Sequence, residues 1–120
     1  MNAIPPQFTP AVDAAGSTAL RWAALLEAAA LVAALAGREP DRAEHDVPAL
    51  ICGAEAWRRD RAEAGVADLA AIMEPGLAAL LAVNARGADP QPAALALWRE
   101  FSAARAAILT LLLPDPQAGA

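Results

Sequence analysis

The apolar residues of this chain gather in four stretches, in which they recur at steps of three and four residues. That period is typical of an α-helix with one buried face. No stretch alternates between apolar and polar residues as a half-buried strand does, and no repeat of fixed length is present. Because short connections separate the stretches, neighbouring helices should run antiparallel. The pattern therefore predicts an all-α fold, an antiparallel up-down bundle of about four helices.

The first predicted helix is the most apolar, since its segment Trp22–Leu35 carries a single charge, Glu27. A helix that is apolar nearly all round lies at the centre of a bundle, at a subunit contact or in a membrane. Gly37 is the expected C-terminal end. The candidate N-caps are the short polar residues that precede the segment: Asp13, Ser17 and Thr18.

The second predicted helix has two candidate starts. Asp41 and Glu44 have the spacing of a capping box. A start at Asp46 is favoured, because Pro48 then falls in the first turn, where its missing N–H costs nothing. Gly65 is the expected end. The expected buried stripe consists of Leu50, Ile51, Ala54 and Trp57.

The third and fourth helices follow the same logic. The third begins at Val66 and ends near Asn84–Gly87, and Pro75-Gly76 inside it predicts a kink or a break. The fourth begins near Pro90–Pro92 with Asp89 as its cap, and ends at Leu113.

These elements divide the chain into three parts. Residues 1–12 should form an irregular arm, because three prolines there lack the N–H donors of a helix or strand. Residues 13–113 should form the helical bundle, and residues 114–120 a flexible tail.

Composition adjusts this picture. Hydrophobic residues make up 58% of the chain, but 36 of the 120 residues are alanine, which favours helix and buries little area. All nine basic residues are arginine, which favours a bacterial genome rich in G and C. The net charge of −5 disfavours nucleic-acid partners, and a single cysteine suits the cytoplasm. No secretory signal is predicted at the start.

A membrane span is disfavoured. Extending Trp22–Leu35 to the length that a bilayer requires brings in Arg21 at one end and Gly37–Glu39 at the other. Alanine is also only weakly apolar on membrane-insertion scales.

Candidate chemistry is sparse. His45 is flanked by acids at the start of the second helix, and Cys52 follows it, but two ligands do not make a metal site. No catalytic motif, metal site or cofactor site is predicted. The densest basic patch, which could hold an anion or an acidic partner segment, consists of Arg58, Arg59 and Arg61.

Glu27 and the tryptophans support the main alternative. If the first helix were central, Glu27 would be a buried carboxylate in need of a partner. The chain would then be a small-ligand-binding or enzymatic bundle, with an apolar pocket near Glu27 lined by Trp22, Trp57 and Trp98. The competing interpretation places Glu27 on the solvent-facing line of the helix.

The favoured hypothesis is a non-enzymatic, self-associating protein–protein interaction module, most simply a dimer, which could also bind another protein. Its size, acidity and all-helical layout resemble the general plan of bacterial export chaperones, including the flagellar ones. The predicted interface residues come from the first and last helices: Trp22, Leu25, Leu26, Val32, Leu111 and Leu112.

Overall fold

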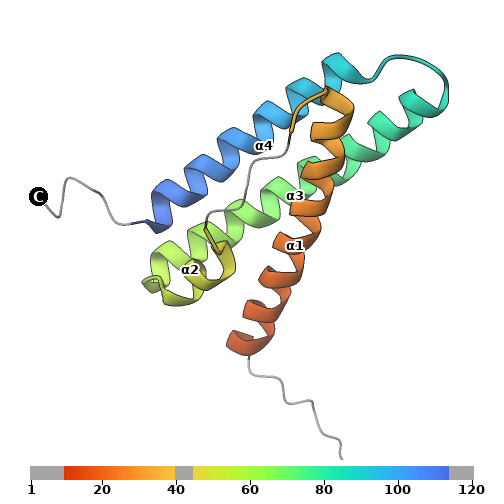
Figure 1. The fold of residues 1–120 in the computed structure, drawn as a ribbon. Helices are drawn as coiled ribbons and strands as arrows, with labels where there is room; N and C mark the ends of the chain where they lie inside the picture. Colours follow the sequence, from red (N-terminus) through yellow and green to blue (C-terminus); the bar gives the residue numbers. More distant parts are fainter. Residues whose placement is uncertain (1–9, 40–44, 114–120) are drawn as a thin grey trace, which may run out of the picture.

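The computed structural model describes residues 10–39 and 45–113, and these residues contain helices and no strand. The helices are α1 (Pro10–Ala36), α2 (Val47–Gly53), α3 (Ala56–Ala85) and α4 (Gln91–Leu112). The three long helices pack against one another in pairs, and the short α2 contacts all of them (Figure 1). The predicted all-α four-helix bundle is confirmed.

Two hydrogen bonds show how the helices are ordered. The Thr18 hydroxyl donates to Glu63 Oε2 at 3.3 Å and ties the first half of α1 to the beginning of α3. The Gln91 side-chain amide donates to the Ala36 carbonyl at 3.3 Å and ties the end of α1 to the beginning of α4. α1 and α3 therefore run in the same direction, and α4 runs in the opposite direction (Figure 1). The segment that contains α2 returns the chain from the end of α1 to the start of α3.

Glycine ends two of the long helices, as the sequence predicts. Gly37 and Gly87 have φ angles of +74° and +81°, the left-handed conformation that glycine adopts without strain. The next amide in each case donates to a carbonyl five residues back, Arg38 to Ala33 at 2.8 Å and Ala88 to Val83 at 3.2 Å. This pattern is the Schellman motif, which satisfies the last carbonyls of a helix.

Aspartate caps two helix starts, and both were predicted. Asp46 Oδ1 accepts from the Ala49 amide at 3.2 Å, with Pro48 in the first turn of α2. Asp89 Oδ1 accepts from the Gln91 amide at 3.0 Å, at the start of α4. The alternative start at Asp41 lies outside the described residues.

The predicted end at Gly65 is wrong, and the chain breaks earlier. Ala54 and Glu55 are extended, with ψ angles of 159° and 152°, and they separate α2 from α3. Gly65 lies inside α3, where an added Cβ would stand 3.2 Å from Ile108 Cγ1 of α4. Its role is close packing between two helices. The break also shifts the helical phase, so Trp57 is 52% exposed instead of buried.

The predicted break at Pro75-Gly76 does not occur, since α3 continues through both residues. Proline at this position deprives the Ala71 carbonyl of its helical donor. Both Pro75 and Ala71 are exposed, so water can replace that donor.

The N-terminal boundary also needs correction. The predicted arm extended to residue 12, but α1 begins at Pro10, where a proline in the first turn loses no hydrogen bond. Residues 1–9 and the predicted tail, residues 114–120, lie outside the described part of the chain.

The core lies where α1, α3 and α4 meet. Phe101 of α4 is central to it, and its ring stacks on Trp22 and on Trp98, with centroid distances of 6.3 Å and 5.7 Å. Further buried apolar residues come from every helix, among them Val32 of α1, Ile51 of α2, Val66, Leu69 and Met73 of α3, and Ile108 of α4.

Candidate functional site

The predicted interface residues lie mainly inside the bundle. Trp22, Leu25, Val32 and Leu112 are buried within the chain, and Leu26 and Leu111 are half-buried against the same core. α1 is apolar on most sides because it packs against α3, α4 and α2 together. Trp22, Val32 and Leu112 are therefore not accessible to a second subunit unless the core opens, whereas Leu25 also lines the groove between α1 and α3.

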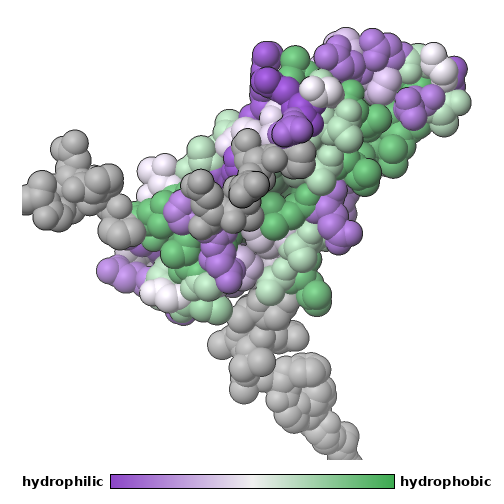
Figure 2. Space-filling model, viewed as in Figure 1, coloured by the Kyte–Doolittle hydropathy of each residue, from purple (hydrophilic) through white to green (hydrophobic). Residues whose placement is uncertain are grey.

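Other large apolar side chains are exposed. On α1 they are Leu20 at 74% and Leu31 at 51%, which lie about three helical turns apart and so on the same side of the helix. On α3, Leu81 is exposed about three turns after Ala70. Apolar side chains gather over the C-terminal half of α3 on the face in view in Figure 2.

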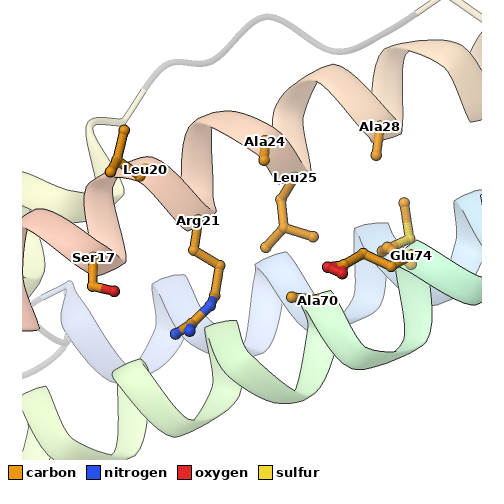
Figure 3. Close-up of a pocket in the computed structure, with 9 residues that line it drawn as sticks. Ser17, Leu20, Arg21, Ala24, Leu25, Ala28, Ala70 and Glu74 are labelled. Carbon is orange, nitrogen blue, oxygen red and sulfur yellow. The ribbon is translucent and has the colours of Figure 1, made fainter.

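A groove of about 330 Å³ lies between α1 and α3, next to these exposed residues. Its α1 wall consists of Ser17, Leu20, Arg21, Ala24, Leu25 and Ala28, and its α3 wall of Ala70, Met73 and Glu74. Leu25 points from α1 toward α3, and Ala24 and Ala28 leave room above Ala70 (Figure 3). The groove is therefore largely apolar, with small side chains at its centre.

Two opposite charges enter this groove from its two walls. Arg21 extends from α1 toward α3, and Glu74 lies on α3 further along the groove (Figure 3). Both residues are exposed. Within the described residues, neither forms an ion pair or a hydrogen bond through its side chain. Each is available to a group from outside the chain.

The predicted arginine patch lies in the first turns of α3 instead of at the end of the second helix. Its cations therefore gain nothing from a helix C-terminus. The Arg58 guanidinium lies 5.2 Å from the centre of the Trp57 ring, and its buried Nε has no hydrogen-bond partner among the described residues. Trp57 Nε1 in turn donates to Glu55 Oε2 at 3.0 Å. Arg59 is half-buried and Arg61 is exposed, and binding of an anion here stays a prediction.

The other candidate residues do not converge on one site. Glu27 is exposed, so it lies on the solvent-facing line of α1. No tryptophan lines the α1–α3 groove. His45 and Cys52 are both exposed, one before α2 and one on it. The described residues contain no group of three or more His, Cys, Asp or Glu side chains placed to hold a metal ion.

Two helices are long and apolar enough to cross a membrane, judged by length and composition alone. They are Ser17–Ala36, which lies within α1, and Ala56–Ala85, which is α3. In their most apolar stretches only 33% and 22% of the residues are buried. The core helix of a water-soluble protein can pass the same test, so this finding is weak support for a membrane protein.

Of the groove residues, the sequence-based interface prediction included Leu25 alone. Leu20, Ala24 and Leu31 share one side of α1. This second apolar stripe is the sequence feature from which the α1 wall of the groove could have been predicted. The opposite wall depends on which helix packs beside α1, which periodicity does not specify. Comparisons with protein-family models, curated proteins and solved structures found no match to this chain.

Proposed function

We propose that this chain is a non-enzymatic helical interaction module that associates with itself through the α1–α3 groove. The observation that carries the proposal is the apolar surface beside the groove, formed by Leu20 and Leu31 of α1 and Leu81 of α3. Exposed apolar patches on small domains commonly mark protein-binding sites. A second chain would remove this surface from water and so supplement the small core of a 120-residue protein.

A protein partner is favoured over a lipid bilayer because charges interrupt both apolar helices. Arg21 and Glu27 lie within Ser17–Ala36, and Asp68 and Glu74 lie within α3. A charged side chain at the centre of a bilayer costs roughly 3 kcal/mol or more. At a protein interface the same charge can pair with an opposite one.

The composition is compatible with a protein that binds other proteins in a bacterial cytoplasm. An exposed, free Cys52 is compatible with a bacterial cytoplasm, where thiols are kept reduced. The net charge of −5 favours a protein partner over a nucleic acid. Association of helices requires no metal and no cofactor.

Leu20→Glu is expected to weaken self-association at least about tenfold, because it replaces an exposed apolar contact with an unpaired charge at the interface. Sedimentation velocity over a series of protein concentrations measures the dissociation constant. Leu20 is 74% exposed within the chain, so the fold should be kept.

Ala23→Glu is the matched control, since it adds the same charge to an exposed position of α1 that does not line the groove. This variant should associate like the wild type. Equal association of Leu20→Glu, Ala23→Glu and the wild type would contradict the proposed use of the groove.

A further inference from the structure

We infer that the α1–α3 groove binds one amphipathic helix of another protein, with an acidic side chain of that helix on Arg21 and a basic side chain on Glu74. The inference goes beyond self-association and rests on the proposed function only in using the same groove. A groove requires a convex partner, and a helix with one apolar face is the element that fits an apolar groove. The position, the length and the charges of the groove support this occupant.

The groove lies on the side of α1 and α3 that faces away from α4. On α1, Trp22 stacks on a ring of α4, and Ala24 of the groove wall lies about 200° further round the helix. On α3, Gly76 meets a side chain of α4, and Glu74 of the groove wall lies about 200° away from it. α4 packs against both helices on its own side of the pair. A further helix in the groove would repeat that packing on the other side.

The apolar surface of the groove is long enough for about four turns of helix. α1 rises about 21 Å from Ser17 to Leu31, at about 1.5 Å per residue. On α3, Leu77 and Leu81 lie about two and three turns after Ala70, so they extend the α3 wall of the groove. Leu31 and Leu81 are exposed. An apolar stripe on the bound helix would remove these leucines from water.

The charges in the groove specify the charges of its partner. Arg21 and Glu74 are exposed, and neither side chain forms an ion pair or a hydrogen bond in the described part of the chain. The hydrogen bond between Thr18 and Glu63 places those two residues at one level of the groove. Arg21 follows that level by one turn and Glu74 by three, so Glu74 lies about two turns further along (Figure 3). An acidic and a basic side chain about two turns apart on one helix can therefore meet both.

The direction of the bound helix follows from the helices beside it. α1 and α3 run in the same direction, as the contacts of Thr18 with Glu63 and of Gln91 with Ala36 require. Their macrodipoles therefore point the same way, and an antiparallel neighbour places opposite dipole ends side by side. α4 already lies antiparallel to both. In this direction the basic residue of the bound helix precedes its acidic residue in the sequence.

The test uses a fluorescein-labelled peptide of about 18 residues, composed of alanine and glutamine with a leucine stripe on one helical face. A lysine at one edge of the stripe precedes a glutamate at the other edge by about two turns. Fluorescence anisotropy measures its dissociation constant. Arg21→Glu should weaken binding at least about tenfold, because it replaces an attraction with a repulsion. A second peptide, with lysine in place of the glutamate, should bind this variant within roughly threefold of the wild-type value.

Ala23→Glu is the matched control for charge, since Ala23 is exposed on α1 and does not line the groove. This variant should bind the first peptide like the wild type. An unchanged helical circular dichroism spectrum establishes that each variant is folded. The inference is overturned if the wild type shows no saturable binding of the first peptide. Equal binding of that peptide by Arg21→Glu and Ala23→Glu also overturns it.

Sedimentation velocity of the wild type without peptide separates this inference from the proposed self-association. A dimeric wild type that does not bind the peptide overturns the inference and leaves self-association standing. A monomeric wild type that binds the peptide with the expected dependence on Arg21 supports the inference and overturns self-association. A monomeric wild type that does not bind the peptide overturns both.

Discussion

Phe101→Ala is expected to lower the free energy of unfolding by about 3 to 5 kcal/mol, the typical cost of removing a buried aromatic side chain. Phe101 is 1% exposed, and its ring stacks on Trp22 of α1 and on Trp98 of its own helix. The Arg105 guanidinium lies 5.4 Å from the centre of the same ring. Removing the ring leaves a cavity between α1 and α4 and ends both stacking contacts. A domain of this size has roughly 5 to 15 kcal/mol of stability in total, so the loss is large.

Trp57→Ala is the control for this prediction, because Trp57 is the exposed aromatic residue of α3. Its loss should cost less than about 1 kcal/mol, mainly through the contact with Arg58. Urea unfolding followed by circular dichroism measures both variants, at one fixed protein concentration because dimerisation would add to stability. If the two variants lost equal free energy of unfolding, the central position of Phe101 in the core would be contradicted.

Gly76→Leu is expected to lower the free energy of unfolding by about 1 to 3 kcal/mol, because α3 and α4 approach closely at this position. A Cβ added at Gly76 would stand 2.8 Å from Leu97 Cδ2, before any larger side chain is built. The extra atoms must displace Leu97 or separate the helices. Gly76→Ala should cost less, since the nearest atom is the free end of a side chain and alanine favours helix.

Ala78→Leu is the matched control, since it places the same side chain at an exposed position of α3 two residues later. Its effect should stay within about 0.5 kcal/mol. Thermal or urea unfolding ranks the stabilities of three variants: Gly76→Leu, Gly76→Ala and Ala78→Leu. If Gly76→Leu were as stable as Ala78→Leu, the close contact of α3 with α4 at Gly76 would be refuted.

Features that depend on a few neighbouring residues could be predicted from the sequence. Gly37 and Gly87 end helices because glycine alone adopts the left-handed conformation there without strain. Asp46 and Asp89 cap helices because their carboxylates accept from free amides of the first turn. Together with the period of the apolar residues, these signals were sufficient to predict four helices and no strand.

Features that depend on tertiary contacts were predicted wrongly. Gly65 was expected to end a helix, but it accommodates Ile108 where α3 meets α4. Pro75 was expected to kink or break α3, and the break does not occur, since the helix continues through Pro75 at an exposed position where water can replace the lost donor. Trp57 was expected in the core, but the break at Ala54 changes the side of the helix on which it lies. At Gly65 local propensity was overridden by packing.

The sequence predicted an apolar site on α1, but not most of the residues that form it. The sequence indicated that α1 has more apolar surface than one buried face needs, and Leu20 and Leu31 carry part of that excess. It did not indicate which leucines the core would use, because that depends on how many helices surround α1. Nor could it bring Arg21 together with Glu74, because 53 positions separate them along the chain.

Sedimentation velocity of the wild-type protein over a range of micromolar concentrations tests the central claim most directly. The account predicts a concentration-dependent shift from a 12.3 kDa monomer to a species of twice that mass. A single species of monomer mass at every concentration would contradict self-association through the α1–α3 groove.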